Sequence, residues 1–217
     1  MTNQELFSYV DHTLLKPEAT PEQIAVLCAE AAEHGTASVC VNGSYVPLAK
    51  KLLDGKAKVC AVIGFPLGAM STAAKAFEAA EAVRDGADEI DMVIHIGQLK
   101  AGNTDYVLED IKAVKAAIGD HVLKVIIETC LLTEEEKITM CRIVTESGAE
   151  YIKTSTGFST GGATFDDVRL FAEHVGEGVK IKAAGGIRSR EDMEQFLQLG
   201  ASRLGTSSAV KILCGKN

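Results

Sequence analysis

Short apolar runs rich in β-branched residues alternate with amphipathic segments along the whole chain. Each run is separated from the next by enough chain for one helix, which is the spacing of βα units. The pattern predicts eight strands, over residues 9–13, 37–41, 58–65, 89–94, 123–129, 151–155, 179–185 and 202–207.

The intervening segments carry helix start and stop signals. Thr20-Pro21-Glu22-Gln23 has the form of a capping box with proline at the first helical position. Three further starts place a hydroxyl residue three positions before an acidic one, at Thr133, Thr164 and Ser189. Glycine closes several of these segments just before the next strand, at Gly35, Gly86, Gly148 and Gly200, as expected for helix ends.

The repeated unit of helix, glycine and strand favours one closed barrel. Eight βα units without a break in composition predict a single (β/α)8 TIM barrel, class α/β, that spans residues 1–217 as one domain. A flavodoxin-like open sheet is the structural alternative.

Composition and charge narrow the class of function. The formal charge is −8, which disfavours binding to nucleic acid or to an anionic membrane. The chain starts without a signal-peptide pattern, and its apolar runs are shorter than a membrane span. The six cysteines lack CxxC spacing, so we expect free thiols and a cytoplasmic protein that acts on a small molecule.

Period-two alternation assigns an unusual set of side chains to the barrel interior. When the apolar positions of each strand face the helices, the other positions face inward. The inward set is Ser38, Cys40, Asn42, Glu89, Asp91, Val93, Lys124, Ile126, Glu128, Tyr151, Lys153, Ser155, Lys180, Lys182 and Ala184, with Lys180 near the start of its strand. A purely structural barrel holds layers of branched apolar residues. Charged groups clustered at the end of a barrel are instead candidates for function.

Two of these lysines precede glycine-rich loops and predict covalent chemistry. Lys153 and Lys182 lie on neighbouring strands, so each is a nearby cation for the other. A neighbouring cation or burial favours a neutral, nucleophilic amine, which attacks a carbonyl to form a Schiff base. An inward carboxylate such as Asp91 would move the protons. The competing interpretation is a set of buried ion pairs without chemistry, and the five histidines show no metal-ligand spacing.

The loops after the last strands predict a phosphate site. Barrel enzymes often bind phosphate there through backbone N–H groups and a helix start. The candidate residues are Gly157, Gly185, Gly186, Gly205, Ser207 and Ser208, while Arg188 either adds charge or lies on the surface.

These motifs together resemble the deoxyribose-phosphate aldolase family over nearly the whole chain. The similar segments, in family order, are DHTLLKPEAT, VCVNGSYV, EIDMVI, LKVIIET, YIKTSTGFSTGGAT, KAAGGIR and LGTSSAV. The resemblance implies that Lys153 is the Schiff-base lysine and that Lys182 is the second lysine, which lowers the pKa of the nucleophile. It also implies that Asp91 relays protons and that Lys124 supports Asp91 near the substrate hydroxyl. Asp11, Cys40 and Thr154 are expected to line the pocket.

The implied reaction is the reversible cleavage of 2-deoxy-D-ribose 5-phosphate to acetaldehyde and D-glyceraldehyde 3-phosphate. The resemblance implies no cofactor and no metal, and a role in deoxynucleoside breakdown. The assembly is left open between a homodimer and a homotetramer. Some relatives have a basic residue after KTSTG and a C-terminal tyrosine, whereas this chain has Phe158 and ends in LCGKN. Phosphate binding is therefore expected to rely on backbone amides and other groups.

Two other functions remain open from the sequence. One is a Schiff-base barrel aldolase for a different sugar phosphate, which substrate preference would separate. The other is a catalytically silent barrel that binds a sugar phosphate without turning it over.

Overall fold

The computed structural model describes residues 1–215, so the last two residues of LCGKN lie outside the described part of the chain. The strands are β1 (Val10–Leu14), β2 (Ser38–Asn42), β3 (Lys58–Ile63), β4 (Glu89–Val93), β5 (Val122–Ile126), β6 (Tyr151–Lys153), β7 (Lys180–Ala184) and β8 (Ala201–Thr206). The helices are α1 (Asn3–Phe7), α2 (Pro21–His34), α3 (Val46–Leu53), α4 (Thr72–Arg84), α5 (Ile96–Lys100), α6 (Thr104–Ile118), α7 (Glu134–Ser147), α8 (Phe165–His174), α9 (Arg190–Gln198) and α10 (Ala209–Cys214). Short 3-10 helices cover Gly43–Tyr45 and Thr129–Leu131.

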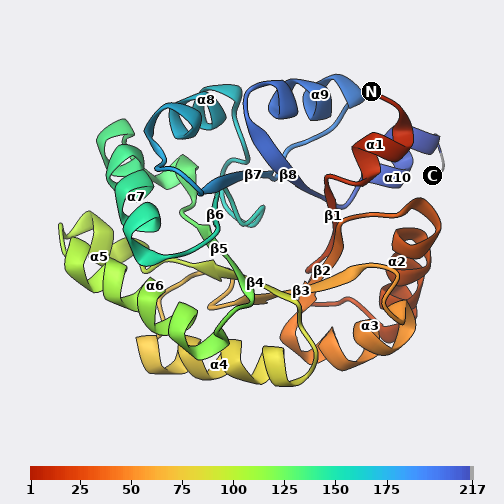
Figure 1. The fold of residues 1–217 in the computed structure, drawn as a ribbon, viewed down its shortest axis with the longest axis horizontal. Coiled ribbons are helices and arrows are strands. Elements are labelled where there is room, and N and C mark those ends of the chain that lie inside the picture. Colours follow the sequence, from red (N-terminus) through yellow and green to blue (C-terminus); the bar gives the residue numbers. More distant parts are fainter. Residues whose placement is uncertain (216–217) are drawn as a thin grey trace.

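The eight strands form a closed parallel barrel in sequence order, and β8 pairs back onto β1. The helices surround this ring of strands (Figure 1). The prediction of a (β/α)8 TIM barrel is confirmed, with all eight strands found close to their predicted positions, and the open-sheet alternative is wrong. The register places Asp91 beside Lys124 and Lys153 beside Lys182 on neighbouring strands.

The helix signals read from the sequence correspond to local hydrogen bonds. Thr20, Thr133 and Ser189 each form a capping box, and Thr164 caps the backbone N–H of Asp167. Gly35 and Gly148 end their helices in the left-handed conformation, which costs glycine little. Within residues 1–215, no helix is both long enough and apolar enough to cross a bilayer.

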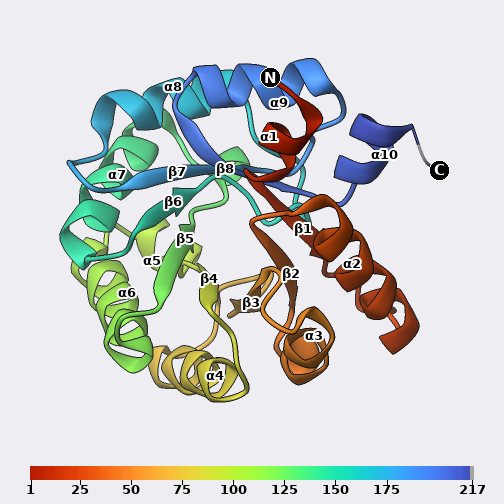
Figure 2. The same ribbon diagram turned by 45° about the vertical axis from the view of Figure 1, so that its right-hand side comes forward.

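The sequence did not predict α1, whose five residues carry only two buried apolar side chains, Leu6 and Phe7. This helix lies beside α10 in Figure 1, and Figure 2 shows it next to α9. The Asn3 side chain donates to the carbonyl of Leu213 over 2.7 Å and so ties the two helices together.

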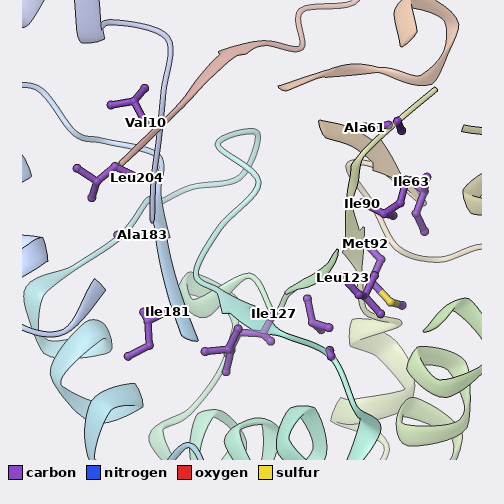
Figure 3. Packing of buried hydrophobic residues seen from close by; sticks show 14 of the residues in the cluster. Val10, Ala61, Ile63, Ile90, Met92, Leu123, Ile127, Ile181, Ala183 and Leu204 are labelled. Atoms are coloured by element: carbon purple, nitrogen blue, oxygen red, sulfur yellow. The ribbon is translucent and has the colours of Figure 1, made fainter. Parts of the chain in front are cut away.

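The main hydrophobic core lies between the strands and the helices. Ile90 and Met92 of β4 and Leu123 of β5 are fully buried there (Figure 3). Each such side chain contributes about 1.5–3 kcal/mol relative to an exposed position. A second, smaller cluster of Leu15, Cys40, Cys60 and Val62 fills the barrel interior beside β1–β3. This cluster covers only part of the interior. The remainder holds the inward-facing polar side chains, which alternate along each strand with the apolar side chains of the main core.

Candidate active site

A pocket of about 460 Å³ opens at the carboxyl ends of β1, β6, β7 and β8. Its wall includes Lys153 of β6, which is 3% exposed. Lys153 is the one predicted catalytic side chain on this wall, because Asp91, Lys124 and Lys182 are fully buried beneath it. A ligand in the pocket would therefore meet the Lys153 amine first.

Asp91 of β4 organises the amines beneath the pocket. Its Oδ2 accepts hydrogen bonds from Lys153 Nζ and Lys182 Nζ, each over 2.7 Å. Its Oδ1 accepts from Lys124 Nζ over 2.8 Å and from the Cys60 thiol over 3.1 Å. Three strands thus direct their lysines at one carboxylate, as the alternation along the strands predicted.

A second layer of charge lies deeper in the barrel. Asp11 pairs with Lys182 and accepts hydrogen bonds from Ser38 and Arg203 through its Oδ1, over 2.7 and 2.6 Å. Glu89 takes two hydrogen bonds from the Arg203 guanidinium, over 3.1 and 3.2 Å, and pairs with Lys124 over 2.7 Å. The two layers are joined because Lys124 and Lys182 contact carboxylates in both.

Mutual attraction keeps Asp91, Lys124 and Lys182 ionised. Burial alone would raise the pKa of Asp91, but Lys124, Lys153 and Lys182 together hold it well below its usual value. Burial would likewise lower the pKa of Lys182, yet Asp11 and Asp91 raise it above its usual value. The pKa of Lys124 is raised in the same way, chiefly by Asp91 against the effect of burial. Lys182 is therefore a permanent cation beside Lys153.

Two thiols complete the wall of this cluster. A hydrogen bond between Cys40 and Cys60 lowers the pKa of Cys40, while burial raises that of Cys60. Cys60 also accepts a hydrogen bond from Lys124 over 3.2 Å, so it links that amine to Asp91. Cys60 was not singled out from the sequence, because an isolated thiol in an apolar strand looks like ordinary core.

The interior also brings metal-ligand types together, which the spacing along the chain did not indicate. Cys40, Cys60 and Asp91 form one such group, and Asp11, Cys60 and Glu89 form another, with ligand atoms within 4.8 Å of one another. The carboxylates of both groups already bind lysine or arginine. These fixed cations supply the countercharge that a metal would otherwise bring, so the residues do not fit a metal centre.

All six residues predicted for phosphate binding line the same pocket as Lys153: Gly157, Gly185, Gly186, Gly205, Ser207 and Ser208. Gly185 and Gly186 have φ of 81° and 76°, a conformation that suits glycine. The Cα of Gly162 packs so closely on this turn that a Cβ there would lie 2.5 Å from the carbonyl of Gly185. Arg188 lies on the pocket rim, where it is exposed.

Glu128 holds the loop that follows β6. Its Oε1 accepts the backbone N–H of Thr156 over 3.1 Å, and its Oε2 accepts the Thr156 hydroxyl over 2.5 Å. Thr156 then accepts the backbone N–H of Phe158 over 3.0 Å. Glu128 was predicted to share the interior with Asp91, but the structure directs its carboxylate at this loop instead, because β5 ends at Ile126 and Glu128 has φ of 56°.

Three residues expected to line the pocket lie deeper than its wall. Asp11 belongs to the lower charge layer, and Cys40 packs in the small interior cluster with Leu15 and Val62. The Thr154 hydroxyl exchanges hydrogen bonds with the backbone of Ala184, each over 3.1 Å, and so links β6 to β7. These three side chains therefore do not border this pocket, and their role toward a ligand stays a prediction.

The bottom of the barrel holds one residue that the sequence located and one that it missed. Lys180 is exposed at the start of β7, over the ring of Tyr151 at 5.8 Å, in agreement with its expected place near the bottom. Arg203 was not assigned a role, although it lies two residues before Gly205 in β8 and so shares its face of the strand. That parity was the signal that would have placed it inside.

Comparison with known proteins identifies the relatives of this chain. Residues 6–217 match the model of the DeoC/LacD family aldolases. A deoxyribose-phosphate aldolase of Clostridioides difficile is 56% identical over 97% of this chain and 96% of its own length. One from Streptococcus suis is 58% identical, with the same coverage of both chains.

Solved structures give the same relatives. A putative deoxyribose-phosphate aldolase from Coccidioides immitis matches with a TM-score of 0.96 and 42% identity, over 99% of this chain and 87% of its own. A deoxyribose phosphate aldolase from Aeropyrum pernix, described as tetrameric, matches with a TM-score of 0.89 and 33% identity, over 99% and 92%.

Proposed function

The chain belongs to the DeoC/LacD aldolase family, and on that premise we propose that it works as a class I aldolase through a Schiff base on Lys153. The reaction is the reversible cleavage of 2-deoxy-D-ribose 5-phosphate to acetaldehyde and D-glyceraldehyde 3-phosphate. Curated relatives more than 50% identical carry the name of this enzyme. The assignment of the nucleophile depends on one observation. Among the lysines of residues 1–215 that are buried in the barrel, only Lys153 borders the pocket.

The first step is attack of the neutral Lys153 amine on C1 of the open-chain aldehyde. The carbinolamine loses water and leaves an iminium cation, which serves as an electron sink. Asp91 Oδ2, which already binds Lys153 Nζ, then lies against this new cation and stabilises it.

Bond cleavage follows from the iminium. Asp91 accepts the proton of the C3 hydroxyl as the bond between C2 and C3 breaks. The electrons of that bond form the C1–C2 double bond of an enamine, the iminium π electrons return to nitrogen, and glyceraldehyde 3-phosphate leaves. Protonation of C2 and hydrolysis of the iminium then release acetaldehyde and restore Lys153. We assign both proton transfers to Asp91, whose Oδ2 contacts Lys153 Nζ: it takes the hydroxyl proton and returns it to C2, while Lys182 keeps its charge.

Support for the phosphate end comes from other residues that line the same pocket. The backbone turn at Gly185-Gly186 and the Ser207-Ser208 segment border it at the ends of β7 and β8. We assign the phosphate to their N–H and hydroxyl donors, with Arg188 at the rim. Lys124 supports Asp91, to which it is hydrogen-bonded.

A direct assay tests this function. Acetaldehyde release should be fast with 2-deoxy-D-ribose 5-phosphate and much slower with D-ribose 5-phosphate, which carries a 2-hydroxyl. A preference for the hydroxylated sugar would favour an aldolase for another sugar phosphate. Binding of the deoxy sugar without product would favour the silent barrel.

We also infer a cytoplasmic location and assembly into a homodimer or homotetramer. All six cysteines are free thiols, which suits a reducing compartment. Leu67 and Phe77 are 76% and 68% exposed near the start of α4, where a second copy would cover them. Light scattering on the purified protein checks the assembly, and a monomer at micromolar concentration would contradict it.

A further inference from the structure

Seven charged side chains of the barrel interior form one connected network. Three are carboxylates and four are bases: Asp11, Glu89, Asp91, Lys124, Lys153, Lys182 and Arg203. With every group ionised the network carries one excess positive charge. An uncompensated charge is costly in a buried site, so the network is best balanced when one base is neutral.

The contacts indicate which base gives up its proton. Lys124 faces three carboxylates, with Nζ 2.7 Å from Glu89, 2.8 Å from Asp91 and 3.8 Å from Asp11. Lys182 contacts both Asp11 and Asp91. Lys153 contacts only Asp91 within the network, through the oxygen that Lys182 also binds. Lys153 is therefore the least compensated cation, and its loss of a proton leaves three positive and three negative groups.

Glu89 and Arg203 take part in this balance without reaching the pocket. Glu89 lies two residues before Asp91 on β4, which places it about 7 Å further down the strand. Arg203 contacts Glu89 and Asp11, and its side chain is 11% exposed at the bottom of the barrel. Asp91 and the three lysines that bind it thus lie between these two residues and the pocket.

We propose that Glu89 and Arg203 are positioning residues that set, through the charge balance of this network, the pH at which Lys153 becomes a nucleophile. Glu89 acts through Lys124 and Asp91, and Arg203 acts through Asp11 and Lys182. The proposal rests on the function proposed above, in which Lys153 forms the Schiff base. It goes further because it assigns control of that step to a pair of residues the substrate never touches.

Other titratable groups around Lys153 do not take over the role proposed for Glu89 and Arg203. Cys40 and Cys60 face the network from β2 and β3, Tyr151 lies under Arg203, and Glu128 binds Thr156 above. Lys58 reaches Glu89 at 3.5 Å, but its side chain is 58% exposed, so solvent screens it. Lys16 and Arg188 are exposed on the pocket rim.

The test measures the pH dependence of borohydride trapping at Lys153 with acetaldehyde, from pH 5 to 9. Acetaldehyde carries no phosphate that could titrate. The fall in trapping on the acid side of the pH profile, the acid limb, therefore reports the protonation of the Lys153 amine. Glu89→Gln removes a negative charge and should move the acid limb to lower pH. Arg203→Gln removes a positive charge and should move it to higher pH, each by about one pH unit for a unit charge at this range.

Two further variants distinguish the loss of a charge from a change in the shape of the side chain. The double variant Glu89→Gln/Arg203→Gln restores the balance and should return the limb to its wild-type position. Arg203→Lys keeps the positive charge and should also keep the wild-type limb. Circular dichroism confirms that each protein is folded, and if one single variant does not fold, the other and the double variant still decide the result.

Limbs that stay in place, or that move in the same direction in both single variants, would overturn the proposal even though Lys153 is still trapped. The failure of the proposed function looks different. In that case wild-type protein gives no adduct at Lys153 at any pH, and the inference falls with it.

Discussion

Lys153 and Lys182 donate to the same oxygen atom, Oδ2 of Asp91, each over 2.7 Å. Two amines that share one acceptor lie within the range of strong mutual repulsion, about 4–6 Å. Asp11 and Asp91 hold the charge on Lys182, because they raise its pKa against the effect of burial. Lys182 is therefore the fixed cation of this pair, and Lys153 is the amine that borders the pocket.

The Lys182→Leu substitution tests whether Lys182 is the fixed cation that favours a neutral Lys153. It removes the fixed cation, so Asp91 and Asp11 retain the Lys153 proton more strongly. We expect the acid limb of the kcat/KM profile to move upward by at least about one pH unit, with most activity lost at pH 7. An unchanged pH profile in a folded Lys182→Leu protein would show that Lys182 does not tune the nucleophile.

Glu128→Gln tests the loop after β6. The neutral amide weakens two hydrogen bonds from Thr156, and Thr156 and Gly157 both border the pocket. We expect KM for the phosphorylated sugar to rise about tenfold, since bonds to a charged group contribute roughly 1.5–3 kcal/mol. Trapping with acetaldehyde alone should be unaffected, whereas an equal loss with both compounds would place the effect at Lys153 instead.

Gly162→Ala tests the close packing behind the phosphate turn. The added Cβ would meet the carbonyl of Gly185 at 2.5 Å, so the turn has to shift. We expect a higher KM for the phosphorylated substrate and a lower melting temperature. The matched control is Gly43→Ala, where a Cβ meets no atom within 4 Å, and its melting temperature and KM should equal those of the wild type. Equal KM values and equal melting temperatures for the two variants would contradict the assignment of the Gly185-Gly186 turn to phosphate binding.

The buried carboxylates predict loss of stability in acid. The pKa of Asp91 and of Asp11 is lowered by the surrounding lysines, although burial acts in the opposite direction. Their contribution is complete above the unfolded pKa of about 3.9 and is lost as the pH falls through the lower folded value. Urea midpoints should therefore decline steadily below about pH 4. The decline should be shallower in Asp11→Asn, and a decline as steep as that of the wild type would contradict this origin.

The repeated βα units were enough to predict the barrel, and period-two alternation along the strands predicted the charged layer in its interior. Asp91, Lys124, Lys153 and Lys182 were all placed inside by one parity rule, and the structure brings their charged ends together. Glycines 185 and 186 were located by their position after β7.

How deep a side chain lies in the barrel, and in which direction it points, was harder to predict, because both depend on where each strand ends. Glu128 follows parity only until β5 ends, after which a positive φ turns it toward Thr156. Asp11 and Cys40 face inward as predicted, but below the pocket wall. Lys75 forms a fully buried ion pair with Asp110 between α4 and α6, over 2.6 Å. Nothing in the helical pattern separates Lys75 from a solvated lysine, since the partner lies on another helix.

The most direct test of the central claim is borohydride trapping with acetaldehyde, followed by peptide mass spectrometry of wild-type protein and Lys153→Leu. We expect an ethyl adduct on Lys153 alone in the wild type. The folded variant should give no adduct, and its turnover should fall by at least about 10³-fold, since it has lost its nucleophile. An adduct on Lys182 would reverse the two roles. No adduct on the folded wild-type protein would contradict the Schiff-base mechanism itself.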